Sequence, residues 1–298
     1  MDRLTSYLPL LPYRDTQMPL LIETPSLFLF VPADRPDRYA GALESGADAV
    51  VIDLEDAVAA ETKSIARSML VDRLLSVPVA TVPVLVRVNG AGTSFHADDL
   101  AAVSCLLQAG RMAGVMLPKA ESAGHIRAIR AGLALPAAIV ALVETAAGLA
   151  LADEIAGTAD RIAFGSVDFA ADIGCDHSRE ALLHARSRLV IAARAAGMPA
   201  PIDGVTRAIR DEEAIESDAR HGAGLGLKGK LLIHPAQIAP ARRGFAPTEA
   251  EVAWSDRVLA AMGNGAAVSL DGQMVDAPVI ARARQIRNNH DRTSNGHP

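Results

Sequence analysis

Short apolar runs, separated by longer stretches of mixed polarity, recur along most of the chain. Runs rich in Val, Ile and Leu that are apolar almost throughout are typical of parallel strands covered on both faces. The stretches between most of them have the length and composition of crossover helices. The pattern predicts strands at 26–31, 49–54, 82–88, 114–117, 137–143, 161–167, 201–205 and 230–233.

Strands and helices that alternate in this way favour a closed (β/α)8 barrel, the TIM barrel, over an open doubly wound sheet. No glycine-rich dinucleotide fingerprint follows the first apolar run, which also disfavours the open sheet. We expect an N-terminal arm at 1–24, a catalytic barrel at 25–246 and a C-terminal helical extension at 247–298. The extension starts with a predicted capping box, Thr248 with Glu251, and continues into a glycine-rich hairpin and a second helix.

Two carboxylates follow consecutive predicted strands. The run AAIVALV leads into Glu144, RIAFGSV leads into Asp168, and 145–156 between them is a predicted crossover helix. Neighbouring parallel strands end at the same edge of a sheet, so the two side chains are expected to lie close together. Such a pair either shares a proton or holds a divalent cation, and Mg²⁺ suits a site with few protein oxygens. The alternative is that one acid caps a helix and the other pairs with an arginine.

Polar residues recur at the same end of the predicted strands, which is typical of barrel enzymes. A structural alternative accompanies several of them: Arg87 as the ion-pair partner of Asp53 or Glu55, Lys119 as an ion-pair partner, and His234 as a helix-start residue. Structural need alone would not place charge at one end of so many strands. The residues are Asp53, Glu55, Arg87, Lys119, Glu144, Asp168, Asp203 and His234.

Composition narrows the possible partners. With 29 basic and 35 acidic residues interspersed, the formal charge is −6 and no basic block is present, so nucleic acid is not an expected partner. Cys105 and Cys175 form no metal or redox motif and are interpreted as reduced thiols. The longest apolar run, 131–143, is too short to cross a bilayer and contains Pro136. A soluble cytoplasmic protein without a membrane partner is predicted.

Several motifs, in order along 26–246, are similar to one known group. They are FVPADRPDRYAGALESGADAVVIDLEDAV, LVRVNGAGTSFHADDL, GVMLPKAES, ALVETAAGL, AFGSVDFAADIG, IDGV and GKLLIHPAQI. The chain resembles the citrate lyase β-subunit-like group of the HpcH/HpaI aldolase superfamily, which includes the malyl-CoA and citramalyl-CoA lyases. The resemblance implies a TIM barrel with a C-terminal extension, assembled as a homotrimer or hexamer.

The resemblance also implies roles for individual residues. Glu144 in ALVET and Asp168 in FGSVD match Mg²⁺ ligands, and Arg87 in VRVN matches the arginine that contacts the substrate carboxylate and oxyanion. Asp276 in LDGQMVDAP resembles an aspartate that the extension of an adjacent subunit donates. Arg35, together with Arg38, is a candidate for the coenzyme A phosphates, with a solvated helix-start arginine as the alternative.

The implied function is a Mg²⁺-dependent lyase that cleaves a 3-hydroxyacyl-CoA, of citramalyl-CoA or malyl-CoA type, to acetyl-CoA and a 2-oxo acid. Glu144 then helps to bind substrate through the metal, and Asp276 protonates the acetyl-CoA enolate; the alternative for Asp276 is a turn acid held by its own backbone. The base for the hydroxyl and the group on C3 of the substrate stay open. Three alternatives remain: a malyl-CoA-type thioesterase, a citrate lyase β subunit acting on an acyl-carrier-protein thioester, and a non-catalytic barrel that binds CoA or an organic acid.

Overall fold

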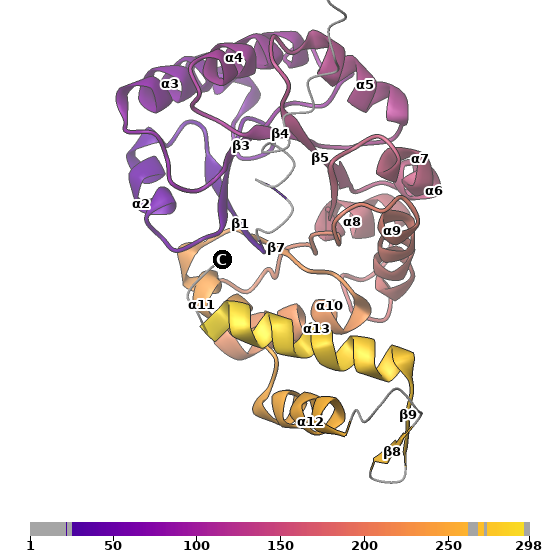
Figure 1. Cartoon of the computed structure of the whole chain (residues 1–298). Coiled ribbons are helices and arrows are strands. Elements are labelled where there is room, and N and C mark those ends of the chain that lie inside the picture. The colour runs from indigo at the N-terminus through magenta and orange to yellow at the C-terminus, as the bar shows by residue number, and fades with distance from the viewer. Residues whose placement is uncertain (1–21, 23–25, 262–267, 271–272, 295–298) are drawn as a thin grey trace, which may run out of the picture.

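Seven parallel strands form a sheet that curves into a barrel (Figure 1). The computed structural model describes residues 22, 26–261, 268–270 and 273–294. Along the sheet the order is β6-β5-β4-β3-β2-β1-β7. The strands are β1 (Leu27–Pro32), β2 (Ala49–Asp53), β3 (Val84–Arg87), β4 (Gly114–Leu117), β5 (Ala138–Val143), β6 (Arg161–Phe164) and β7 (Lys230–Leu232).

The barrel closes between β6 and β7 through a short extended segment. Ile202 pairs with Ala163 of β6, and Asp203 pairs with Lys230 of β7, each as an isolated parallel bridge. This segment is the seventh strand predicted at 201–205, reduced to two bridging residues. The predicted eighth strand therefore corresponds to β7, and the (β/α)8 prediction is confirmed.

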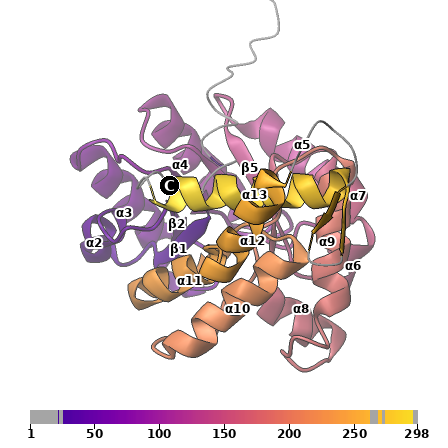
Figure 2. The ribbon, with the colours of Figure 1, turned by 60° about the horizontal axis from the view of Figure 1, so that its bottom comes forward.

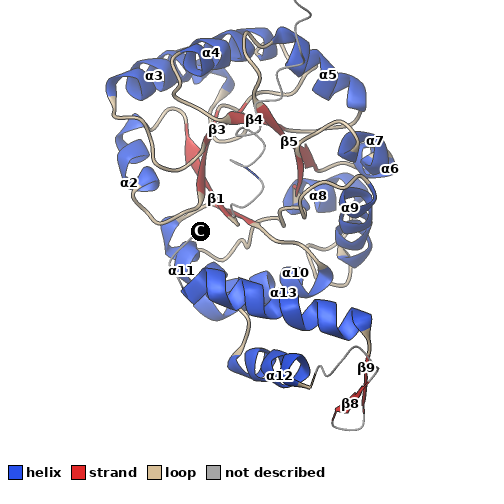
Figure 3. Cartoon of the chain, viewed as in Figure 1, coloured by secondary structure: helices blue, strands red, loops and turns tan. Residues whose placement is uncertain are grey.

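Helices surround the barrel, as the blue ring in Figure 3 shows. No helix in the described part of the chain is long and apolar enough to cross a membrane. The α-helices around the barrel are α2 (Tyr39–Leu43), α3 (Lys63–Ser76), α4 (His96–Gln108), α5 (Ala123–Gly132), α6 (Ala146–Ala150), α7 (Ala152–Ala156), α8 (Ser166–Ile173), α9 (Leu183–Ala195), α10 (Glu212–Leu225) and α11 (Ile238–Phe245), with short 3-10 helices η1 (Pro36–Arg38), η2 (Ala60–Thr62) and η3 (Pro235–Gln237).

Alternate residues of each strand fill the barrel or face the helices. On β1, Phe28 and Phe30 belong to the interior cluster, whereas Leu27 and Leu29 pack outward. Such layers of inward side chains make a TIM barrel a packed core rather than a pore. Ile22, from the predicted N-terminal arm, is fully buried within this interior cluster.

The predicted crossover at 145–156 and the predicted sixth strand differ from the structure in detail. The crossover is split into α6 and α7 at Leu151, with Thr145 as the N-cap of α6. β6 ends at Phe164, three residues before the predicted end at 167, because α8 already begins at Ser166. The apolar pattern of RIAFGSV continues across the boundary, since Val167 follows in the first turn of the helix.

The C-terminal extension follows α11. It consists of α12 (Glu249–Ala260), the hairpin strands β8 (Val268–Leu270) and β9 (Gln273–Val275), and α13 (Ala277–Ser294). Thr248 and Glu251 form the predicted capping box. A small cluster that includes Val258, Val275 and Ala283 joins α12 to α13, and Figure 2 shows α13 lying across α12. The extension thus has its own small core.

Candidate active site

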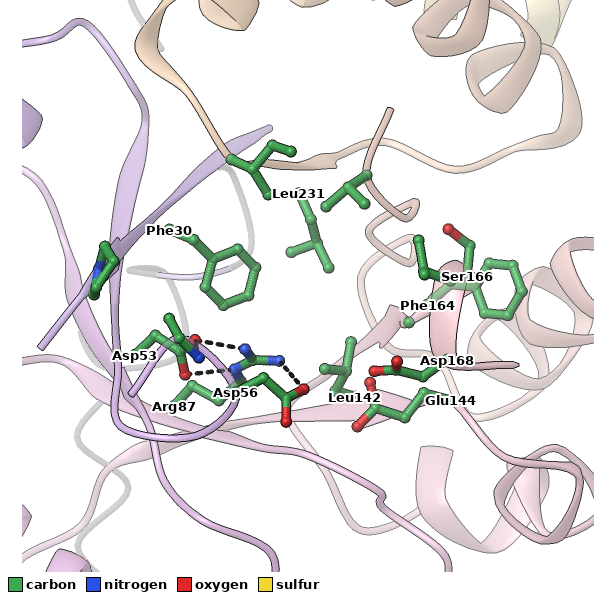
Figure 4. A pocket seen from close by; sticks show the side chains of 16 residues that line it. Phe30, Asp53, Asp56, Arg87, Leu142, Glu144, Phe164, Ser166, Asp168 and Leu231 are labelled. Carbon is green, nitrogen blue, oxygen red and sulfur yellow. Dashed lines mark hydrogen bonds and ion pairs between the residues drawn. The ribbon is translucent and has the colours of Figure 1, made fainter. Parts of the chain in front are cut away.

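A cavity of about 360 Å³ lies among the C-terminal ends of the strands. Acids and an arginine stand on one side of it, and Phe30, Leu142 and Leu231 supply apolar surface (Figure 4). The charged residues on its lining are Asp53, Asp56, Arg87, Glu144 and Asp168. This is the end of a TIM barrel at which active sites are built.

Glu144 directly follows β5 and is 1% exposed. Its Oε1 accepts a hydrogen bond of 2.8 Å from the backbone N–H of Lys119. Burial, followed by the charge of Glu55 and then that of Asp168, raises the pKa of Glu144 to about 8, although the Lys119 N–H and Arg87 oppose the rise. The carboxylate is therefore held at a position where its negative charge needs a further positive partner.

The apolar run had suggested that Asp168 ends a strand, but it does not. It lies in the first turn of α8, after the chain turns at Gly165. A Cβ at position 165 would clash with the Glu144 carboxylate, so the missing side chain of Gly165 lets the two elements approach. Figure 4 shows the Glu144 and Asp168 carboxyl groups side by side, so the predicted pairing holds by a different route.

Arg87, the last residue of β3, is surrounded by acids. Its Nε and Nη2 donate to the two Asp53 oxygens at 2.7 and 2.5 Å, and its Nη1 lies 3.1 Å from Glu55 Oε2. Burial acts to lower the pKa of Arg87, but the hydrogen bonds and charge of Asp53 outweigh it and raise the pKa. The guanidinium also stacks on Phe30, with its carbon 4.8 Å from the ring centre. The ion-pair alternative for Arg87 therefore describes its resting contacts, and the same contacts fix the guanidinium on the cavity wall.

Lys119 connects the two halves of this site, one formed by Arg87 with Asp53 and Glu55, the other by Glu144 with Asp168. Its Nζ donates to Glu55 Oε1 at 2.6 Å and lies 4.0 Å from Glu144 Oε1. Burial raises the pKa of Glu55, although Arg87 and Lys119 counteract this effect. The site is thus a row of alternating charge that runs from Asp53 to Glu144.

The two carboxylates fit a divalent cation. Within the described residues no group of three or more His, Cys, Asp or Glu side chains could hold a metal ion. A pair of acids beside an open cavity, one with a raised pKa, instead suits an ion such as Mg²⁺ that keeps several positions for water or substrate. Glu144 and Asp168 would hold it.

Four other predicted polar residues lie elsewhere. Arg35 pairs with Asp37 on the surface, 2.8 Å apart. Asp276 is exposed at the start of α13, where its Oδ1 accepts from Val279 N–H, and it does not line the cavity of its own chain. Asp203 accepts from Arg186 Nε at 2.8 Å on the helix side of the barrel, and His234 is the N-cap of η3, which matches its helix-start alternative.

Sequence reasoning missed one pair beside the site. The buried Ser166, which lines the cavity, lies with its Oγ 2.9 Å from His177 Nε2. Burial, helped by the charges of Arg186 and Arg207, lowers the pKa of His177. The FGS tripeptide before Asp168 was a possible signal for Ser166, but no sequence spacing points to His177 as its partner.

A closed barrel with a carboxylate pair and a fixed arginine at its C-terminal mouth is typical of a metal-dependent TIM-barrel enzyme. The model of the HpcH/HpaI aldolase/citrate lyase family matches residues 26–235. The chain belongs to this family, as its motifs had suggested.

Relatives within the family carry several activities. A citrate lyase subunit beta-like protein of Mycobacterium tuberculosis is 39% identical, over 87% of this chain and 93% of its own length. From Cereibacter sphaeroides, a (3S)-malyl-CoA thioesterase is 36% identical over 86% and 91%, and an L-malyl-CoA/beta-methylmalyl-CoA lyase is 32% identical over 87% and 92%. The crystal structure of M. tuberculosis CitE with magnesium, acetoacetate and coenzyme A matches with a TM-score of 0.79 and 36% identity, covering 91% of this chain and 99% of that one.

Proposed function

We propose that this protein is a Mg²⁺-dependent carbon–carbon lyase that cleaves a 3-hydroxyacyl-CoA of the malyl-CoA or citramalyl-CoA type into acetyl-CoA and a 2-oxo acid. One observation carries the proposal: Glu144, Asp168 and Arg87 line a single cavity of about 360 Å³. The magnesium and coenzyme A in the related CitE structure and the malyl-CoA lyase relative support the same chemistry.

The carboxylate pair has the task of holding the ion and, through it, the acid end of the substrate. When bound, Mg²⁺ supplies a Lewis acid that lowers the pKa of the substrate hydroxyl and neutralises the forming 2-oxo acid. Glu144 and Asp168 orient that end of the substrate. The apolar wall formed by Phe30, Leu142 and Leu231 excludes water from the reacting carbons.

Arg87 stabilises the oxygen charge that develops while the carbon–carbon bond breaks. Its guanidinium is fixed by Asp53, Glu55 and Phe30 before substrate arrives, so little reorganisation is needed during the reaction. The substrate hydroxyl gives up its proton to solvent water, and its oxygen becomes the carbonyl of the 2-oxo acid. The electron pair of the broken carbon–carbon bond passes to the acetyl-CoA enolate, which must then gain a proton at carbon.

Asp276 is the proposed acid for that proton. Because it does not line the cavity of its own chain, the role requires a neighbouring copy whose extension covers the mouth. The proposal therefore includes a homo-oligomer, a trimer or hexamer, in which the extension of one subunit completes the site of the next.

A second cavity, of about 500 Å³, gives the coenzyme A chain a place to lie. It shares Phe30, Pro32 and Ile233 with the first cavity, and Arg38 and His234 stand on its lining. Its apolar surface suits a pantetheine arm, and Arg38 with the nearby Arg35 suits phosphates. The two cavities together match a thioester with one charged end in each.

Hydrolysis of the thioester is the second candidate function. The Ser166–His177 hydrogen bond beside the cavity and the malyl-CoA thioesterase relative both favour it. Hydrolysis would release coenzyme A and a free hydroxy acid without any 2-oxo acid.

A coupled assay on the purified protein tests the proposal. Malyl-CoA and (S)-citramalyl-CoA are offered with Mg²⁺ and with EDTA, while glyoxylate or pyruvate, acetyl-CoA and free coenzyme A are measured. The lyase produces oxo acid and acetyl-CoA in equal amounts, only with Mg²⁺, and Glu144→Gln abolishes both products. Glu154→Gln is the matched control, because Glu154 is an exposed acid on α7. This variant is expected to keep full activity. Free coenzyme A without oxo acid would replace the lyase by the thioesterase, and no product from either substrate would refute both.

A further inference from the structure

The loop after β4 holds an unusual backbone conformation at Lys119. Among the described residues outside glycine, only Lys119 has a positive φ, of 47°. A residue with a side chain populates this left-handed conformation about tenfold less than glycine does. Lysine stands there despite that cost, which indicates that both its backbone geometry and its side chain are used.

The backbone of Lys119 serves Glu144. The N–H of Lys119 donates to Glu144 Oε1 at 2.8 Å. The loop is fixed on its far side, where Ala120 N–H donates to Leu142 O at 3.0 Å. On another side, the backbone of Ala120 approaches α6 so closely that a Cβ on Gly148 would clash with Ala120 O. The left-handed turn therefore directs a backbone N–H at the buried carboxylate of Glu144.

The side chain of Lys119 serves the other half of the site. Its ammonium lies 2.6 Å from Glu55 Oε1, and the second oxygen of Glu55 lies 3.1 Å from Arg87 Nη1. Without the ammonium, Arg87 alone would balance the buried negative charge of Glu55. Less of the guanidinium's positive potential would then remain for an oxyanion in the cavity.

We propose that Lys119 is a positioning residue that connects the two halves of the site: its left-handed backbone holds the metal ligand Glu144, and its ammonium holds Glu55 against Arg87. The inference deepens the proposed lyase function and rests on it for the kinetic part. The two roles are separable, because one belongs to the backbone and the other to the side chain.

Mn²⁺ binding without substrate, measured by the electron paramagnetic resonance of the free ion, tests the backbone role. Lys119→Met and Lys119→Val both remove the ammonium, but a β-branched residue resists a positive φ more strongly. We expect Lys119→Met to bind Mn²⁺ at least as tightly as the unsubstituted protein, because a positive charge 4.0 Å from Glu144 is gone. Lys119→Val is expected to bind about tenfold more weakly than Lys119→Met. Equal affinities of these two variants would overturn the backbone role.

Steady-state kinetics test the side-chain role. Lys119→Gly keeps the left-handed backbone and loses the whole side chain with its ammonium, so kcat is expected to fall about tenfold or more while KM changes little. Lys119→Arg should regain part of kcat, and thermal unfolding should stay within a few degrees because the Lys119 side chain is 47% exposed. A Lys119→Gly enzyme with unchanged kcat would overturn this role. If the unsubstituted protein cleaves no thioester, the proposed function fails, whereas the Mn²⁺ comparison still decides the backbone role.

Discussion

The two ends of the barrel each enclose an arginine that stacks on a phenylalanine of β1. At the mouth, Arg87 lies over Phe30, with its guanidinium carbon 4.8 Å from the ring centre. At the opposite end, Arg161 lies over Phe28 at 5.5 Å. The residue type and the aromatic contact are the same, so the difference between the two ends lies in the other partners of each guanidinium.

Among the described residues, the hydrogen-bond acceptors shown for Arg161 are neutral backbone carbonyls, whereas those of Arg87 are carboxylates. Arg161 donates to Ile22 O at 2.6 Å, Ala200 O at 2.9 Å and Lys228 O at 3.1 Å. Carbonyl oxygens accept hydrogen bonds from a buried guanidinium without adding charge. Carboxylates around Arg87 instead create a field that a bound ion or a reacting oxygen can change. The functional end of the barrel therefore differs from the structural end in having several charged side chains close together beside a cavity.

The largest expected effect is on stability, from Arg161→Met. The substitution leaves one buried and two part-buried carbonyls without this donor, and the free energy of unfolding should fall by about 4 kcal/mol. Urea unfolding measures the loss, and the folded fraction should keep its kcat. As a control, Arg188→Met removes a surface pair with Asp153 and should cost less than about 1 kcal/mol. A loss no larger than that of Arg188→Met would show that the two ends do not differ as described.

A smaller effect is expected from Arg87→Lys, this time on catalysis. Lysine cannot reproduce the two-oxygen contact with Asp53 while also facing the cavity, so kcat/KM should fall by about 100-fold. The coupled assay described above measures this change. Arg188→Lys, at a two-oxygen contact on the surface, provides the matched control and should leave kcat/KM unchanged. A comparable loss in both variants would contradict the assigned role.

The smallest expected effect is a pH dependence at the mouth, where the partners of Arg87 and the neighbouring Glu144 are carboxylates that titrate. Burial raises the pKa of Glu144 from its ordinary value of 4.5 to about 8. In the metal-free protein, the stability linked to this proton is complete below pH 4.5 and is lost as the pH rises to about 8. A divalent cation competes with the same proton, so Mn²⁺ affinity should fall up to about tenfold per pH unit as the pH drops below 8. Calorimetry at several pH values checks this, and Glu144→Gln should remove the slope.

Most of the fold was predictable from hydrophobic pattern, since strands buried on both faces leave an unmistakable apolar signature. The prediction was weakest where a segment is stabilised by contacts rather than by its own pattern. The run at 201–205 forms only two bridges, one from Ile202 to β6 and one from Asp203 to β7. The run at 161–167 hides a helix start, since Val167 continues the apolar pattern after the chain has turned at Gly165.

The site was predictable where residues follow strands directly, as Glu144 and Arg87 do. The spacing of strands brings such residues together, and Figure 4 shows the outcome. The contacts of Lys119 with Glu55 and of Ser166 with His177 join segments that are distant in sequence, or that a loop brings together, and no local pattern encodes their approach. The roles of Asp276 and Arg35 remain predictions, because each depends on a partner outside the chain: a second subunit or a bound coenzyme.

Ile22 has a consequence for the order of folding. It is fully buried in the barrel interior, and its carbonyl accepts from Arg161, which lies 139 residues further along the chain. During synthesis residue 22 leaves the ribosome long before the strands that surround it exist, and closing so long a loop is entropically slow. Ile22 must therefore wait for the barrel, so a residue that is made early belongs among the last to reach its place.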